Sequence, residues 1–262
     1  MKFNTIYNED CLKTMAKMPD NFIDLVVTSP PYDNLRDYKG YTFDFGSTAK
    51  ALYGILKPGG VVVWVVGDQR KNFNKTLTSF KQALFFQEIG FKVPDIMIYE
   101  KDSGMPQKNW YTPIYEFMII LVKGDKPKTI NVSQVKSAWA GTVYGGGRRD
   151  ADGSFKKRQR KPVPEYINKS NIWKYATGKN KTTKDDFAFK HPAMFPEQLA
   201  SDHIKSWSNE GDIVYDPFMG SGTTAKMAML LDRKYIGSEI SKEYCEIAEA
   251  RLKPLKDQVR LM

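Results

Sequence analysis

An alternation of short apolar runs with amphipathic helical patterns is the feature that most constrains how this 262-residue chain can fold. Residues 22–27 and 61–66 are almost wholly apolar, as strands buried on both faces of a parallel sheet are. Between them, residues 47–57 place apolar side chains at helical spacing and run into a Pro-Gly-Gly turn. Strands that alternate with helices in this way predict an α/β fold with a mostly parallel sheet.

The same pattern extends along most of the chain. It predicts seven strands, at residues 3–7, 22–27, 61–66, 92–99, 114–122, 213–216 and 235–239. It predicts helices at residues 12–18, 47–57, 75–89, 196–207, 223–231 and 241–253. No helical pattern separates residues 92–99 from residues 114–122, so we expect these two strands to pair as antiparallel neighbours.

Residues 124–190 break this alternation, because they are polar, basic and irregular. Residues 123–190 hold 17 Lys and Arg against 6 Asp and Glu, whereas the remainder of the chain holds 23 against 24. A segment of this length is too long for an ordinary connection, so we divide the chain into residues 1–123, an insertion at 124–190, and residues 191–262. Positive charge concentrated in this way favours a nucleic-acid partner, and the alternative is a solubilising surface.

Composition excludes several other classes. No apolar run approaches the roughly 20 residues that cross a bilayer, and the first five residues carry no apolar signal core, so we expect a cytoplasmic protein of prokaryotic or phage type, without a membrane partner. The only cysteines, Cys11 and Cys245, are expected to be reduced residues of the core. With two histidines and no cysteine pair at ligand spacing, we expect no metal site.

A glycine turn near the carboxyl end is the first candidate site. Residues 215–224, Tyr-Asp-Pro-Phe-Met-Gly-Ser-Gly-Thr-Thr, combine a strand end, a turn and a helix start, where backbone N–H groups can meet a ligand. Glu239 ends the next strand, a place from which an acidic side chain can accept hydrogen bonds from ribose hydroxyls. The turn lacks the third glycine of a dinucleotide fingerprint and the lysine of a P-loop, so it favours a nucleoside ligand. The alternative is a tight turn that merely connects strand to helix.

The second candidate site is the turn Thr28-Ser29-Pro30-Pro31-Tyr32, which follows the buried strand 22–27. The two prolines hold the backbone extended, so that the Ser29 hydroxyl and the Pro30 carbonyl become acceptors with a set direction. Tyr32 adds a flat ring beside them. Acceptors next to an aromatic ring suit a planar substrate that carries an amino group. The alternative is a polyproline turn with Tyr32 packed on the surface.

Together, the two turns resemble the motifs of the amino-DNA methyltransferases, which methylate N4 of cytosine or N6 of adenine with S-adenosylmethionine. Ser29-Pro30-Pro31-Tyr32 is similar to the catalytic tetrapeptide of that family, and residues 216–224 are similar to its cofactor loop. The catalytic motif comes first here, an order that resembles the circularly permuted β group. The resemblance implies a seven-stranded, mostly parallel sheet of the Rossmann-like methyltransferase type, with the basic insertion as the target-recognition region.

The resemblance also implies a role for individual residues. Asn8-Glu9-Asp10-Cys11 is similar to the motif that contacts the adenine of the cofactor, and residues 191–196 are similar to the segment that borders its methionine end. We therefore expect S-adenosylmethionine to bind at Asp10, Cys11, Phe195, Asp216, Pro217, Phe218, Gly220, Ser221, Gly222, Thr223, Thr224, Glu239 and Ile240. Ser29 and the Pro30 carbonyl would hold the target amino group, and Tyr32 the flipped base, with Pro31 fixing the turn.

Physical chemistry agrees with this assignment. The lone pair of an exocyclic amino nitrogen is delocalised into the base, so acceptors for its hydrogens would make it a better nucleophile and aim it at the methyl group. No cysteine stands in this turn, which argues against the covalent route of carbon-5 methylation. Within the family that the chain resembles, serine at position 29 and the pair Phe195-Pro196 favour cytosine N4. The alternatives are adenine N6, an inactive methyltransferase fold that binds nucleic acid, and an RNA or small-molecule methyltransferase.

Double-stranded DNA is the expected partner. Phosphate contacts are expected from Arg148, Arg149, Lys156, Lys157, Arg158, Arg160 and Lys161. The aromatic residues of the insertion, Trp139, Tyr144, Trp173 and Tyr175, are expected to form its small core rather than to stack on DNA. A homodimer and a cognate restriction endonuclease acting on the same site both remain open at this point.

Overall fold

The computed structural model describes residues 1–31, 43–143, 146–157, 161–178, 180–190 and 194–259. These residues form two compact units. The first unit joins residues 1–131 to residues 171–262, and the second spans residues 132–170. Tyr32, Tyr144, Arg158 and Arg160 from the sequence predictions lie outside the described residues.

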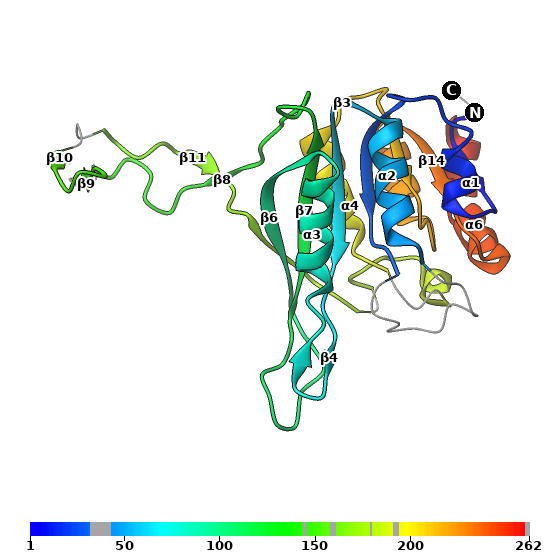
Figure 1. The fold of residues 1–262 in the computed structure, drawn as a ribbon, viewed down its shortest axis with the longest axis horizontal. Helices are drawn as coiled ribbons and strands as arrows, with labels where there is room; N and C mark the ends of the chain where they lie inside the picture. The colour runs from blue at the N-terminus through cyan, green and yellow to red at the C-terminus, as the bar shows by residue number, and fades with distance from the viewer. Residues whose placement is uncertain (32–42, 144–145, 158–160, 179, 191–193, 260–262) are drawn as a thin grey trace. The chain divides into compact units, whose positions relative to one another are not determined.

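A twisted sheet is the centre of the first unit (Figure 1). In its described part the sheet has eight strands in the order β1, β14, β13, β2, β3, β7, β6, β12. The bounds of these strands are β1 Thr5–Tyr7, β2 Ile23–Thr28, β3 Leu56–Val66, β6 Phe91–Lys101, β7 Tyr115–Lys123, β12 Ile172–Tyr175, β13 Ile213–Asp216 and β14 Lys234–Ser238. Only β7 runs antiparallel to its neighbours β3 and β6, which confirms the predicted antiparallel pair and the mostly parallel α/β sheet.

The eighth strand corrects the sequence prediction of seven. β12 comes from within the predicted insertion and pairs parallel to β6. Its side chains alternate, with Trp173 and Tyr175 buried and Ile172 and Lys174 exposed. Trp173 packs on the ring of His203, 4.8 Å away between centroids, so these aromatics belong to the core of the large sheet and not to a core of the insertion. A four-residue alternation inside a basic region is too short to distinguish from irregular sequence.

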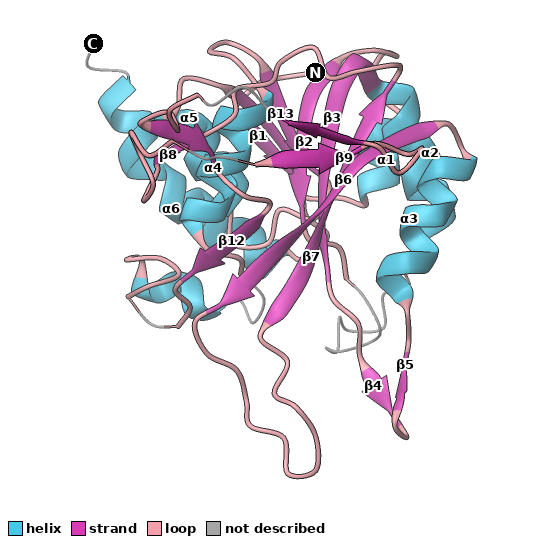
Figure 2. Ribbon diagram, turned by 90° about the vertical axis from the view of Figure 1, so that its left-hand side faces the viewer, coloured by secondary structure: helices cyan, strands magenta, loops and turns pink. Residues whose placement is uncertain are grey.

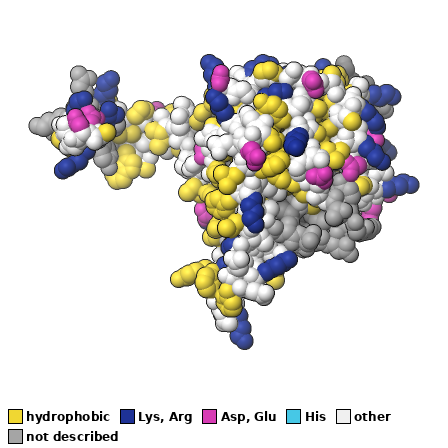
Figure 3. Space-filling model, viewed as in Figure 1, with side chains coloured by type: hydrophobic (Ala, Val, Ile, Leu, Met, Phe, Trp, Pro, Cys, Tyr) yellow, Lys and Arg dark blue, Asp and Glu magenta, His cyan; other side chains and the backbone are white. Residues whose placement is uncertain are grey.

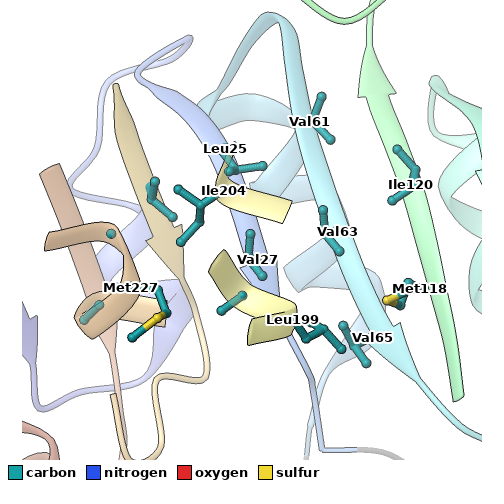
Figure 4. Close-up of a cluster of buried hydrophobic side chains, with 14 of the residues drawn as sticks. Leu25, Val27, Val61, Val63, Val65, Met118, Ile120, Leu199, Ile204 and Met227 are labelled. Carbon is teal, nitrogen blue, oxygen red and sulfur yellow. The ribbon is translucent and has the colours of Figure 1, made fainter. Parts of the chain in front are cut away.

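In the part of the chain that the structure describes, six helices cover the two faces of this sheet (Figure 2). Their bounds are α1 Cys11–Met15, α2 Phe45–Ile55, α3 Thr78–Glu88, α4 Glu197–Trp207, α5 Thr223–Leu230 and α6 Lys242–Val259. The side chains of β3 alternate between the faces: Val62, Trp64 and Val66 pack with α1 to α3. Val61, Val63 and Val65 pack toward α4 to α6, where Figure 4 shows Val65 beside Leu199. Helices on both faces explain why the strands read as unbroken apolar runs.

Short ribbons make up the other described strands. In the second unit, β8 (Gln134–Lys136) pairs with β11 (Tyr166–Asn168), and β9 (Gly147–Arg149) pairs with β10 (Phe155–Lys157). In the first unit, β4 (Arg70–Lys71) and β5 (Asn74–Lys75) form a hairpin after β3, and the 3-10 helix η1 covers Asp186–Lys190. None of the described helices is long and apolar enough to span a membrane.

Candidate active site

A pocket of about 790 Å³ of empty space, partly open to solvent, lies at the carboxyl ends of β1, β2, β13 and β14. This is the edge at which open parallel sheets carry their ligands. Its walls are formed by residues that follow those four strands, together with the segment before α4 and one residue of α6: Glu9, Asp10, Cys11, Ser29, Pro31, Met194, Phe195, Asp216, Pro217, Phe218, Met219, Gly220, Ser221, Thr223, Glu239, Ile240 and Tyr244.

Most of the predicted site residues therefore meet in one place. Every predicted cofactor residue lines the pocket except Gly222 and Thr224. Ser29 and Pro31 of the predicted catalytic turn line it too, while Pro30 is buried beside it. The two candidate turns, which are far apart in the sequence, share a single cavity.

The two glycines of the turn have different tasks. Both have a positive φ, 53° at Gly220 and 82° at Gly222, which the left-handed region permits for glycine at little cost. A Cβ atom at Gly222 would lie 3.0 Å from the Ala248 Cβ of α6, so Gly222 lets two helices approach each other. Gly220 instead directs its N–H into a hydrogen bond with Glu239 (2.8 Å).

Glu239 is held by the backbone around it. Its Oε2 accepts the N–H of Gly220 and its Oε1 accepts the N–H of Ser241, both at 2.8 Å. Burial raises the pKa of the Glu239 carboxyl above its ordinary value, and the backbone hydrogen bonds oppose this shift. A carboxylate oxygen accepts more than one hydrogen bond, so both oxygens keep capacity for a ligand at the pocket wall.

Asp216 connects the two turns. Its Oδ1 accepts the Thr28 hydroxyl at the end of β2 (2.6 Å) and the N–H of Phe218 (3.0 Å). Its Oδ2 lies 2.8 Å from the Thr224 hydroxyl oxygen, which is also 3.0 Å from the carbonyl oxygen of Val27. Burial raises the pKa of Asp216 to about 6. A protonated Asp216 could donate to Thr224, leaving the single Thr224 proton for Val27.

The first turn of α1 forms another wall. Asp10 is the N-cap of this helix, and its Oδ1 accepts the N–H of Leu12 (2.7 Å). The free Cys11 thiol is buried, and burial raises its pKa to about 12, so it stays neutral and is not a nucleophile. Cys245 is likewise free and buried, in agreement with the expectation of two reduced core cysteines.

A cluster of charges around a buried arginine lies behind the glycine turn. The Arg251 side chain is completely buried and forms ion pairs with Asp185 (2.7 Å) and with Glu197. Its Nη1 also donates to the Ser221 carbonyl (3.1 Å) and to the Thr223 hydroxyl (3.0 Å). Lys226 of α5 pairs with the same two carboxylates, at 2.7 and 2.8 Å. Arg251 thus supports the turn from outside the pocket.

Sequence reasoning did not find Arg251, although a signal was present. Arg251 falls four residues after Ile247, on the apolar stripe of the last helix, and an arginine there must find partners. The pocket residues Glu9, Met194, Met219 and Tyr244 were also missed. The first three stand inside the motifs themselves, next to residues that received a role, so assigning each motif as a whole would have included them.

The predicted DNA-binding residues lie in the second unit or at its border. Arg148 pairs with Asp150 at 2.9 Å and Lys156 pairs with it at 2.7 Å, so one acidic residue partly balances two of the predicted contacts. Arg149 and Lys161 are exposed. Lys157 ends β10.

The sheet order, the single antiparallel strand and the glycine-lined pocket define an S-adenosylmethionine-dependent methyltransferase of the Rossmann-like class. The family model for the N6 and N4 DNA methylases matches residues 23–250, and the chain belongs to this DNA methylase family. The orphan methyltransferase M.BamHII of Bacillus amyloliquefaciens is 55% identical over 244 residues, which are 89% of this chain and 90% of that protein.

Solved structures show the same fold. The PvuII DNA methyltransferase, described as cytosine-N4-specific, superposes with a TM-score of 0.69 at 20% identity, covering 97% of this chain and 90% of that one. The DNA modification methylase TTHA0409 of Thermus thermophilus, in complex with S-adenosylmethionine, superposes with a TM-score of 0.65 at 22% identity, covering 95% and 93%.

The buried carboxyl of Asp216 predicts a pH-dependent effect of the substitution Asp216→Asn. The pKa of Asp216 is about 6 in the folded state and has its ordinary value of 3.8 in the unfolded state. Between these pH values the folded protein binds more protons than the unfolded protein, so the free energy of unfolding falls as pH rises through this window. Asn cannot ionise and can donate to Thr224. We therefore expect the stability of Asp216→Asn relative to the wild type to rise by about 2 kcal/mol between pH 4.5 and pH 7.5.

Urea unfolding of both proteins at several pH values measures this difference. Because other groups titrate equally in both proteins, the comparison isolates position 216. A difference in unfolding free energy that stays constant from pH 4.5 to 7.5 would show that Asp216 is ionised throughout.

Proposed function

We propose that this DNA methyltransferase transfers a methyl group from S-adenosylmethionine to the N4 amino group of cytosine at specific sites in duplex DNA. The observation that carries the proposal is the presence of Ser29 in the wall of the pocket that Glu239 and the glycine turn also line. The choice of cytosine rests on serine as the first residue of the Ser-Pro-Pro-Tyr turn and on Phe195-Pro196. The orphan status of the relative M.BamHII supports a role without a paired endonuclease.

The residues of the pocket fit the cofactor. Glu239 offers two buried, backbone-fixed carboxylate oxygens to ribose hydroxyls, and Phe195 and Phe218 offer aromatic surface in the same cavity. Asp10 lines the pocket after β1, where it would face the adenine. When bound, S-adenosylmethionine supplies an electrophilic methyl group on a sulfonium.

The catalytic turn would act on the target amine. Ser29 and the Pro30 carbonyl accept its hydrogens, which draws the nitrogen away from planarity and holds its lone pair toward the methyl group. Positioning and electrostatics carry such a reaction, and no covalent enzyme intermediate is needed. The raised pKa of the Cys11 thiol agrees with this, because a neutral thiol in the pocket is a poor nucleophile.

The base must leave the helix to reach the pocket, as in other enzymes that act on a base. The basic residues of the second unit would hold the duplex through its phosphates, which positions DNA without reading its sequence. Binding through phosphates weakens with salt.

Glu239→Gln tests the cofactor assignment. The amide keeps the shape of the side chain but replaces one acceptor oxygen by a donor, so we expect S-adenosylmethionine to bind at least about tenfold more weakly. Calorimetric titration measures this affinity. Glu9→Gln is the matched control, since Glu9 lines the same pocket but already pairs with Lys17 at 2.6 Å. Equal losses in both variants would contradict a specific role of Glu239.

Ser29→Ala tests the catalytic turn. Removing the hydroxyl deletes one acceptor for the target amine, so we expect methyl transfer to fall by about 10²-fold or more while cofactor affinity changes less than about twofold. Transfer of radiolabelled methyl groups to DNA measures the rate. Ser201→Ala, on α4, is the control and should be fully active. Full activity of Ser29→Ala would remove this residue from the mechanism.

The product identifies the target atom. We expect DNA methylated by the protein and digested to nucleosides to contain N4-methyl-2′-deoxycytidine, seen by mass spectrometry, with the sites located by methylome sequencing. N6-methyl-2′-deoxyadenosine instead would overturn the choice of base but keep the class of enzyme. Bound cofactor without any methyl transfer to mixed-sequence DNA would favour a nucleic-acid-binding protein that lacks turnover.

A further inference from the structure

Two loops stand beyond the pocket at the catalytic edge of the sheet, by which we mean the edge formed by the carboxyl ends of the parallel strands, where Ser29 lies. Residues 67–77, which contain the β4–β5 hairpin, follow β3, and residues 102–114 connect β6 to β7. The strands β3 and β6 run parallel to β2, so both loops begin at the edge that carries Ser29. β3 is also the direct neighbour of β2. Both loops project from this edge in Figures 1 and 2.

The tips of these loops present large apolar side chains to solvent. The exposed fractions are 78% for Phe73, 83% for Met105, 53% for Trp110 and 87% for Tyr111. The Phe73 and Trp110 rings meet edge to face with centroids 6.2 Å apart, so the two loops touch at their tips. The Arg70 guanidinium lies 4.8 Å from the centre of the Trp110 ring. We call this group the aromatic tip: Arg70, Phe73, Met105, Trp110 and Tyr111.

The charge around the aromatic tip is almost purely basic. The two loops carry Arg70, Lys71, Lys75 and Lys108, and their only acidic residues are Asp68 and Asp102. Both carboxylates are engaged away from the tip. Asp68 accepts the N–H and the hydroxyl of Ser79, at 2.9 and 2.8 Å, and Asp102 pairs with Lys181 at 2.9 Å. Hydrophobic and basic side chains accordingly gather on the projection in Figure 3.

Phe73 occupies a backbone position that suits a different residue. Asn72 and Phe73 form the two-residue turn between β4 and β5, and their φ angles are 48° and 60°. Turns of this kind favour Asn-Gly, because a bulky side chain is strained in the left-handed region. The exposed ring gains little packing in return for this strain. Strain of this type is found where a side chain has a functional contact.

We propose that the aromatic tip contacts the DNA duplex beside the target base, with its rings against bases that extrusion leaves unstacked and its basic side chains on the flanking phosphates. Proteins that distort DNA insert apolar wedges between base steps, and aromatic rings stack on exposed bases of any sequence. This proposal rests on the proposed function, because the pocket must receive a base from a duplex lying along this edge.

Phe73→Gly gives the sharpest test. Glycine relieves the left-handed turn while it removes the ring, so the melting temperature should stay unchanged or rise, whereas a merely structural ring would lower it. We expect at least about tenfold weaker duplex binding, and Trp110→Ala should weaken binding similarly. Binding is measured by fluorescence anisotropy with a labelled duplex that contains the methylation site. Leu84→Ala is the control, since Leu84 is 66% exposed on α3, outside both loops.

The basic residues predict a second measurement. Replacing Lys71 and Lys108 together by alanine should reduce the slope of log affinity against log salt by about two, because each lost phosphate contact releases one counterion fewer. Phe73→Gly should leave that slope unchanged. This separates the two parts of the aromatic tip within one binding assay.

Three results would overturn the proposal. Duplex affinity of Phe73→Gly and Trp110→Ala equal to that of Leu84→Ala would show that the tip does not touch DNA. Weaker binding of Phe73→Gly accompanied by a lower melting temperature would show a structural ring. Dissociation of a dimer by these variants in sedimentation would show that the tip binds a second copy. Cofactor affinity and methyl transfer by the wild type are measured separately, so a wild-type protein that binds duplex DNA without methylating it would refute the proposed function alone.

Discussion

The pocket depends on the hydrogen bonds of Asp216. β13 and β2 share only two register pairs, Val214 with Leu25 and Tyr215 with Val26, so the ladder ends before the strands reach the catalytic edge. The hydrogen bond from Thr28 to Asp216 continues the connection at this point, between residues 188 positions apart in the sequence. The turn that carries Ser29 and the turn that carries Gly220 therefore start from a common, buried anchor. Complete burial destabilises the charged form of the Asp216 carboxyl. The hydrogen bonds of the same carboxyl hold the two turns at a fixed distance from each other.

A set of partly buried charges fixes the glycine turn from behind. Arg251 and Lys226 share the carboxylates of Asp185 and Glu197, and Arg251 also reaches the turn itself. Buried ion pairs add little net stability, since desolvation offsets their attraction, but they allow few alternative geometries. Asp185 precedes η1, in the segment that follows the second unit along the chain. The cluster therefore connects the segment around Asp185, which follows the basic region, with the glycine turn that would hold the cofactor.

The features that could be predicted from the sequence are those that rest on strong local patterns. Runs of valine and isoleucine indicated the strands, and the glycine turn with Glu239 at the next strand end indicated the pocket. The missed features depend on tertiary contacts. β12 is four residues long with Lys174 between its buried aromatics, and only the β6 edge makes it a strand. The burial of the Arg251 charge is possible because three other segments of the chain supply its partners. Asn72-Phe73 lacks the glycine that signals such a turn, so local preference does not predict the β4–β5 hairpin.

The reversed strand β7 determines what stands at the catalytic edge. In a purely parallel sheet, each strand is followed by a crossover, usually through a helix, that returns the chain to the opposite edge. Because β7 runs antiparallel, residues 102–114 leave β6 and re-enter the sheet at the same edge, where the Lys101 N–H donates to the Ile114 carbonyl and closes the loop. The edge then divides by the position of the strands in the sheet order. β1, β13 and β14 present the glycine turn and the acidic residues that would hold the cofactor, whereas β2, β3 and β6 present the Ser29 turn, proposed to be catalytic, and the two basic, aromatic loops. The basic and aromatic side chains of the two loops complement a substrate with negative charge and stackable bases. Because β7 is antiparallel, residues 102–114 stand at the same edge as residues 67–77, so both loops can reach that substrate.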